Sequence, residues 1–224
     1  MFPPIFETGF SQKPLIKKYK KYRNISKKLI EKILKQFIDE QSIQKSAQLL
    51  GISEGKTLVF DSEEETHFLF DFSLFESELD GKTAFRRYQE QQPKLSKIKT
   101  EILKALPLNY LSLFKIIEVN PTEASVSLSN LLGEPKQVQI IDVGLSQTGQ
   151  PGLLIFTRII PFSDFSMTSG MFAIFPAHSE KTLLKRYKSK MKKVKSNKES
   201  VQLFVTFFKL NRTEGLEIST LQLN

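Results

Sequence analysis

The sequence contains no cysteine and no tryptophan, and it has only two histidines, His67 and His178, among 224 residues. Without cysteine the chain forms no disulfide, holds no thiolate-bound metal and has no cysteine nucleophile. Two histidines so far apart in the sequence are too few for a histidine zinc site. We therefore expect no metal and no cofactor. The lack of cysteine fits a reducing compartment, so we expect a cytoplasmic protein.

Long apolar runs are also missing. No window approaches the ~18 apolar residues of a membrane-spanning helix. The first residues lack the basic flank and the apolar stretch of a signal peptide. The sequence therefore predicts a soluble protein without a transmembrane segment.

Recognisable catalytic patterns are missing as well. The chain has no phosphate-binding Walker loop, no dinucleotide-binding glycine pattern and no indicated Ser-His-Asp arrangement. Asp142, Glu118 and Asp164 lie on or near predicted strands, and a metal-dependent nuclease cluster of the three is one reading. Solvated or turn carboxylates are the other reading. We therefore rank an enzyme behind the two binding functions described below, and we predict no catalytic residue.

Phenylalanine is abundant, with 19 residues against 5 tyrosines. Because phenylalanine carries no polar atom, the surplus predicts core filling. A hydrophobic fraction of 40% and a charged fraction of 25% are ordinary for a globular chain. A chain of this length buries enough surface to fold without a disulfide or metal.

The formal net charge of +9 is unevenly distributed. Residues 1–60 carry +7, residues 61–92 carry −6, and residues 178–200 carry +7. Either a basic helix docks on the acidic segment within the molecule, or the basic segments form an outward surface for an anionic partner. The acidic segment can neutralise only part of the positive charge, so positive surface must remain.

Apolar periodicity predicts an α+β fold. Spacings of three and four predict one kinked helix or two over 15–37, then helices over 42–50, 62–79, 83–91 and 95–106. Ser62 and Glu65 have the spacing of a capping box. Five short apolar runs follow, at 113–119, 125–128, 137–143, 153–160 and 171–175, and predict a small five-stranded antiparallel barrel of SH3-like or OB-like form. Ser179 can cap a basic C-terminal helix, while 201–210 suits helix or strand.

These elements divide the chain into three segments. Residues 1–106 form a helical region, with a basic part at 13–40 and an acidic part at 61–92. Residues 107–177 form the small barrel, and residues 178–224 form the basic helix and a C-terminal segment.

Several stretches resemble those of a widespread group of uncharacterised bacterial proteins. The resemblance covers roughly residues 58–177 and rests on Asp71–Glu76, Asp80–Thr83, Leu113–Pro121, Val126–Leu132 and Gly152–Pro161. In that group an acidic, aromatic helical stretch precedes a small β-barrel. Some members carry a short cysteine-rich zinc motif like the C-terminal tail of the preprotein-translocase ATPase, which this chain lacks. The resemblance implies the barrel and no particular activity.

Asp71 lies among four phenylalanines of a predicted helix. A buried carboxylate needs hydrogen bonds or a cation. Arg86 or Arg87 could supply that cation, so we expect a structural ion pair there.

Lysines and tyrosines alternate in both basic helices, and this is the strongest functional signal. Lysines neutralise phosphates, and exposed tyrosines stack on bases. The other reading is a solvated face with the tyrosines packed inward. The predicted nucleic-acid-binding residues are Lys17, Lys18, Tyr19, Lys20, Lys21, Tyr22, Arg23, Lys185, Arg186, Tyr187, Lys188, Lys192 and Lys193.

The first function hypothesis is therefore a non-enzymatic accessory protein that binds nucleic acid, RNA in preference, through the phosphate backbone. The second is an interaction or assembly factor that docks an acidic protein surface, since a surplus of phenylalanine could leave apolar faces to share. A basic amphipathic helix on an anionic membrane is a further alternative. The first hypothesis requires the positive charge to gather on one exposed region.

Overall fold

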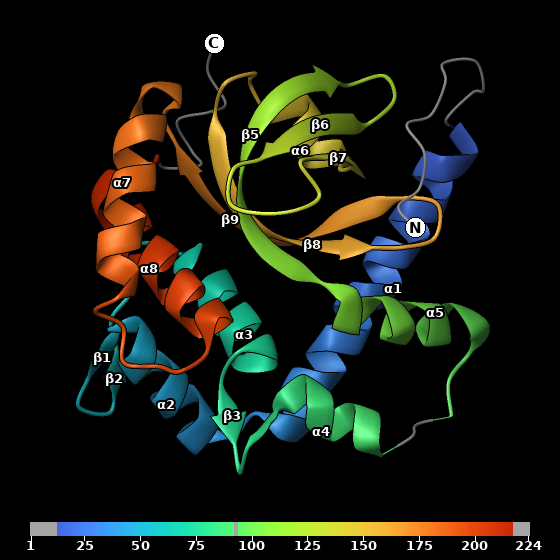
Figure 1. Cartoon of the computed structure of the whole chain (residues 1–224). Coiled ribbons are helices and arrows are strands. Elements are labelled where there is room, and N and C mark those ends of the chain that lie inside the picture. The colour runs from blue at the N-terminus through green and yellow to red at the C-terminus, as the bar shows by residue number, and fades with distance from the viewer. Residues whose placement is uncertain (1–12, 92–93, 217–224) are drawn as a thin grey trace.

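A computed structural model describes residues 13–91 and 94–216. The chain forms a helical N-terminal part, a five-stranded antiparallel sheet and two C-terminal helices, so the α+β prediction is confirmed (Figure 1). The elements are α1 (Lys13–Phe37), α2 (Glu40–Leu50), β1 (Ser53–Glu54), β2 (Thr57–Leu58), α3 (Glu65–Phe75), β3 (Glu78–Leu79), β4 (Lys82–Thr83), α4 (Ala84–Glu90), α5 (Lys97–Ala105), η1 (Leu106–Leu108), β5 (Tyr110–Asn120), β6 (Ser125–Asn130), β7 (Gln137–Ile141), α6 (Val143–Thr148), β8 (Leu154–Pro161), β9 (Ser166–Phe175), η2 (Ala177–Ser179), α7 (Glu180–Met191) and α8 (Glu199–Glu214).

The five predicted strands form one sheet in the order β7-β6-β5-β8-β9. It is not closed into the expected barrel, because in the described residues the edge strands β7 and β9 do not pair with each other. Parts of the two edge strands nevertheless lie close together. Thr168 of β9 donates to Asp142, which directly follows β7, at 2.9 Å. The sheet is therefore open.

Alternation along the strands builds a core on each face of the sheet. Leu113, Phe156 and Phe175 face the helices, where α2, α3 and α8 cover them. Their neighbours Phe114 and Ile155 pack on the other face, together with Leu145 of α6. Residues from all three sequence segments thus share one core. Every phenylalanine of the described residues except Phe70 is buried or half-buried, as the core-filling prediction requires.

Two helices differ from their prediction. The ambiguous run 201–210 is helix α8, whose Phe204, Phe207 and Phe208 are fully buried. Because this helix is apolar nearly all round, its sequence lacks a one-sided period. The predicted capping box at Ser62 does not form. Glu65 instead accepts from Arg212 Nε at 2.6 Å and from the backbone of Asp61, and α3 ends at Phe75 rather than at Leu79.

Candidate nucleic-acid interface

Helix α1 has one buried face and one exposed face. Its buried residues are Tyr19, Tyr22, Ser26, Leu29 and Ile33, which recur every three or four positions. They pack against α4, α5 and the β8–β9 turn. Since the helix repeats every 3.6 residues, the positions between them form a single outward face.

Most of the exposed residues of α1 are lysines. We call these lysines the α1 lysine face: Lys13, Lys17, Lys20, Lys21, Lys27, Lys28, Lys32 and Lys35, all exposed. Glu31 is the one acidic residue of the helix. None of these lysines forms an ion pair with any residue that the structure describes. Their charges are therefore available to an external anion.

The tyrosines predicted to stack on bases are not available. Tyr19 and Tyr22 are each 5% exposed. Tyr22 meets the rings of Phe162 and Phe165 edge-on and donates to Glu101. Burial and the Glu101 carboxylate raise the pKa of Tyr22 to about 12. The stacking role was therefore a wrong expectation, and the inward-packed reading is correct for both residues.

Two basic side chains of α1, Lys18 and Arg23, form polar contacts with β9 and the β8–β9 turn. Lys18 Nζ lies 2.8 Å from Asp164 in the β8–β9 turn. Arg23 donates to the carbonyl oxygen of Thr168 in β9. Both side chains point to the flanks of the helix rather than outward. Of the seven predicted residues 17–23, only Lys17, Lys20 and Lys21 remain exposed and unpaired within the described chain.

Helix α7 repeats this arrangement on a smaller scale. Leu183 is fully buried, and Tyr187 is half-buried with its ring stacked on Phe207 at a centroid distance of 5.6 Å. Phe207 therefore covers one face of the Tyr187 ring, while Tyr187 also lines the groove described below. Arg186 is paired with Glu214 at 2.8 Å. The exposed lysines of α7 and the residues after it, which we call the α7 lysine face, are Lys181, Lys185, Lys188, Lys192, Lys193 and Lys195.

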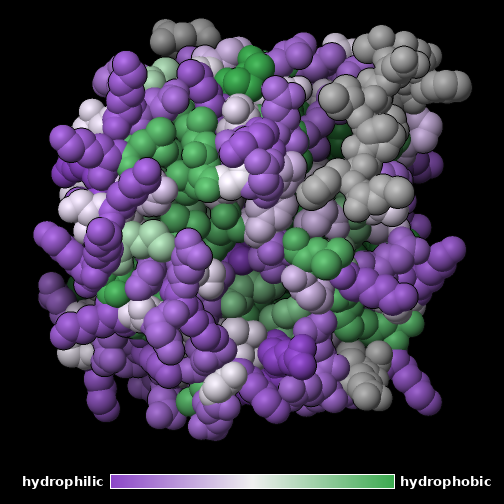
Figure 2. All heavy atoms as spheres, viewed as in Figure 1, coloured by the Kyte–Doolittle hydropathy of each residue, from purple (hydrophilic) through white to green (hydrophobic). Residues whose placement is uncertain are grey.

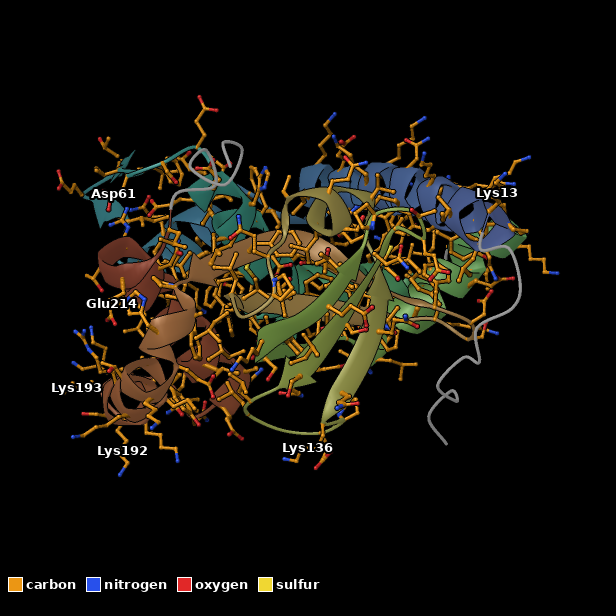
Figure 3. The ribbon with its side chains drawn as sticks, turned by 90° about the horizontal axis from the view of Figure 1, so that it is seen from above. Lys13, Asp61, Lys136, Lys192, Lys193 and Glu214 are labelled. Carbon is orange, nitrogen blue, oxygen red and sulfur yellow. The ribbon has the colours of Figure 1, made fainter. Side chains whose placement is uncertain are left out.

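The two lysine faces do not form one surface. Figure 1 places α7 at one side of the sheet and α1 at the other, with α8 and α3 between them. Figure 3, turned by 90°, shows Lys13 of α1 and Lys192 and Lys193 after α7 at opposite ends of the molecule. The two basic segments therefore do not gather on one exposed region, and the hypothesis that combined them in one surface is contradicted. Only binding by a single lysine face is left to consider. The spatial order of strands and helices decides which segments lie side by side, and this order cannot be predicted from local periodicity.

The acidic segment 61–92 does not cover either lysine face. Its buried carboxylates, Asp71 and Glu76, pair with Arg158 of β8. Glu65, which is also buried, pairs with Arg212 of α8, and the more exposed Glu78 and Glu90 pair with Lys198 and Lys82. Helix α1 does pack on α4 of this segment through its apolar face, but among the described residues no lysine of α1 pairs with a carboxylate of the segment.

Arg158 and Asp71 form the buried ion pair predicted for Asp71, with a different arginine. Arg158 Nε lies 2.8 Å from Asp71 Oδ1 and its Nη2 lies 2.8 Å from Glu76 Oε1. Its guanidinium also covers the ring of Phe75, 4.5 Å from the centroid. Burial raises the pKa of Asp71, and the Arg158 charge opposes that rise. The expected partners Arg86 and Arg87 were wrong, because Arg86 pairs with Glu90 and Arg87 donates to the carbonyl oxygen of Phe37.

A groove of about 1070 Å³ opens beside this ion pair, between α4, β5 and the pair α7–α8. Glu76, Asn130 and Arg158 belong to its floor, and Lys188 and Lys192 belong to its α7 wall. Figure 2 shows hydrophobic residues in the hollow middle of this side of the molecule, with hydrophilic side chains around them. Sequence reasoning missed the groove because its residues come from many separate elements, which include α3, α4, β5, β8, α7 and α8.

Residues 13–91 and 94–216 contain no cluster of side chains that could hold a metal ion. No three histidines or carboxylates there are grouped as metal ligands. Asp142 caps α6 by accepting from the Leu145 N–H at 3.0 Å, Asp164 pairs with Lys18, and Glu118 is exposed. The nuclease-cluster reading of these three carboxylates is therefore wrong. Among the helices described, none is long and apolar enough to cross a bilayer.

Comparison with known proteins gives a family. The model of a family of unknown function, DUF7986, matches residues 13–221. The chain belongs to this family. Neither the curated proteins nor the solved structures contain a match to the chain. The DUF7986 match begins at the first residue of α1 and extends past the end of α8, so both lysine faces and the groove lie within the part of the chain that defines the family.

Proposed function

We propose that this DUF7986 protein binds the phosphate backbone of nucleic acid through the α1 lysine face. One observation carries the proposal. Eight exposed lysines lie on one side of a 25-residue helix without an ion-pair partner among the described residues. A surface of this kind raises the local concentration of a polyanion and steers its approach.

The length of α1 suits a linear polyanion. At 1.5 Å per residue the helix is about 37 Å long, which is close to one turn of B-form duplex, about 34–36 Å. Lysine residues occur in the first, middle and last turns of the helix, from Lys13 to Lys35. Each ammonium group that neutralises a phosphate releases a condensed counterion, and this release drives binding.

The buried tyrosines decide which form of nucleic acid fits. Proteins that prefer single strands stack successive bases on exposed aromatic side chains. Tyr19 and Tyr22 are packed inside the protein and cannot do this. The contacts are therefore with phosphates alone, which makes binding independent of sequence and favours duplex RNA or DNA over unpaired strands.

An acidic protein surface is the competing occupant of the α1 lysine face. The phenylalanine surplus does not support an acidic protein partner, because Phe70, 44% exposed, is the only exposed phenylalanine of the described residues. The exposed large hydrophobic residues Val59, Phe70, Leu108 and Ile117 come from separate parts of the chain. A regular row of lysines along a straight helix suits the even charge spacing of a duplex better than an irregular protein surface.

The test compares two triple variants that each remove three positive charges. Lys17, Lys20 and Lys21 are changed to Gln in the first, and the exposed Lys56, Lys136 and Lys209, which lie off both lysine faces, are changed to Gln in the second. Fluorescence anisotropy with RNA and DNA duplexes at low salt should show at least a tenfold weaker affinity for the first variant and less than a threefold change for the second. Equal affinities of the two variants, or no binding by the unchanged protein, would refute the proposal.

A further inference from the structure

The α7 lysine face has the same construction as the α1 lysine face. Lys181, Lys185, Lys188 and Lys192 follow one another at intervals of four, three and four residues. At 3.6 residues per turn these positions lie on one side of the helix. Leu183 and Tyr187 lie on the opposite side, where they pack on α8. The four lysines therefore form one exposed row along the helix, in which Lys188 and Lys192 also line the groove.

The row is held in a fixed position. Leu183 is fully buried in the core that contains β5, β8 and β9, and Val194 packs against the same core. At the start of α7, Glu180 pairs with Lys115 of β5 at 3.0 Å. A helix fixed in this way presents its charges without an ordering cost at the moment of binding. In the described residues none of the four lysines has an ion-pair partner.

The two rows lie on opposite sides of the same rigid body, as both views show (Figures 1 and 3). The sheet, α3 and α8 occupy the space between them. One straight duplex therefore cannot touch both rows. Bending a short duplex around the protein is opposed by its stiffness, since the persistence length of DNA is about 150 base pairs.

We infer that the protein joins two separate nucleic-acid duplexes, one on the α1 lysine face and one on the α7 lysine face. This inference rests on the proposed function and adds a second surface and an architectural role to it. Each row contributes its own phosphate contacts, so the joined state forms without contact between the duplexes. Joining needs both rows on one molecule, whereas binding of one duplex needs either row alone.

The test uses two duplexes of about 30 base pairs, which is about three helical turns. One duplex is biotinylated and immobilised, and the other carries a fluorophore. The full chain is added at low salt below the amount of immobilised duplex, and fluorescence retained on the beads is measured. The unchanged protein should retain the labelled duplex. Excess protein should reduce the retention, because each duplex then binds its own protein molecules.

Three variants make the result specific. The first variant changes three lysines of the α7 row to Gln, namely Lys181, Lys185 and Lys188. The second weakens the α1 row by changing Lys17, Lys20 and Lys21 to Gln. Each variant should still bind the immobilised duplex but lose at least 80% of the retained fluorescence. The control variant with Lys56, Lys136 and Lys209 changed to Gln should retain it in full.

Two outcomes overturn the inference and are distinguishable from failure of the proposed function. If the α7 variant retains the labelled duplex as well as the unchanged protein does, joining proceeds through pairs of α1 faces in an oligomer, and the α7 row has no such role. If the unchanged protein binds the immobilised duplex but retains no labelled duplex, the protein has one nucleic-acid surface. Absence of binding to the immobilised duplex itself refutes the proposed function instead.

Discussion

The guanidinium of Arg23 on α1 lies directly against Gly170 of β9. A methyl group at Gly170 would be only 2.8 Å from Arg23 Nη2, and the backbone of Gly170 has φ = +100°. The left-handed backbone favours glycine there, and a methyl group would in addition force the Arg23 guanidinium to shift. This contact is one of the points that fix the direction of α1, and thereby of its lysine face, relative to the sheet.

Gly170→Ala should destabilise the protein by about 1–3 kcal/mol, the usual cost of a non-glycine residue in a sparsely populated backbone conformation, with an additional cost from the clash with Arg23. Urea denaturation of the single variant measures the total.

A double-mutant cycle with Arg23→Ala separates the two costs. In the Arg23→Ala background the clash is gone, so Gly170→Ala should cost less than it does in the unchanged protein. Equal costs in the two backgrounds would show that Arg23 does not press on Gly170.

Arg158→Leu should destabilise the protein by about 3–5 kcal/mol, because the change leaves the carboxylates of Asp71 and Glu76 buried without their cation. The matched control is Lys115→Met, which breaks the half-exposed pair with Glu180. It should cost about 0–1 kcal/mol. Chemical denaturation measures both. A cost for Arg158→Leu no larger than that of the control would contradict the buried-pair account.

Alkaline pH should destabilise the fold through its buried tyrosines. The pKa of Tyr22, raised by burial and by Glu101, and the pKa of Tyr110, raised by burial, are both about 12, against about 10 in an unfolded chain. As the pH rises from about 10 to about 12, the unfolded chain loses protons that the folded chain keeps. The free energy of unfolding therefore falls, with a slope of up to about one proton per tyrosine.

Tyr22→Phe removes one of these titrating groups. Denaturation curves measured across that pH interval should show a shallower fall for the variant than for the unchanged protein. Identical slopes would mean that Tyr22 ionises as easily in the folded state as in the unfolded state.

Tyr19→Phe should leave duplex affinity within about twofold of the unchanged protein, because Tyr19 is buried and cannot reach a base. Anisotropy titrations against a duplex and a single strand measure this directly. A selective loss of single-strand binding would show that Tyr19 takes part in stacking after all.

Local periodicity predicted most of the fold. The short apolar runs at 113–119 and 153–160 identified β5 and β8, and the three-and-four spacing from Leu15 to Phe37 identified α1. The closed barrel failed because closure depends on whether β7 and β9 pair, and no residue of either strand signals that pairing. Helix α8 was ambiguous because burial on all sides removes the helical period.

For the candidate site, the sequence predicted individual exposed lysines but not how they are arranged in space. The sequence identified which side chains are positive, and Lys17, Lys20 and Lys21 are indeed exposed. It could not identify partners distant in the chain. Asp164 lies 146 residues from Lys18, and Asp71 lies 87 residues from Arg158. It also could not show that α1 and α7 lie on opposite sides, because that follows from the order of the strands between them.

The salt dependence of duplex binding tests the central claim most directly. On duplex DNA the slope of log affinity against log salt is about −0.9 for each phosphate neutralised. Changing Lys17, Lys20 and Lys21 to Gln should therefore reduce the magnitude of the slope by about 2.7, while the variant at Lys56, Lys136 and Lys209 keeps the slope of the unchanged protein. A slope unaltered by the loss of Lys17, Lys20 and Lys21 would contradict phosphate binding by the α1 lysine face.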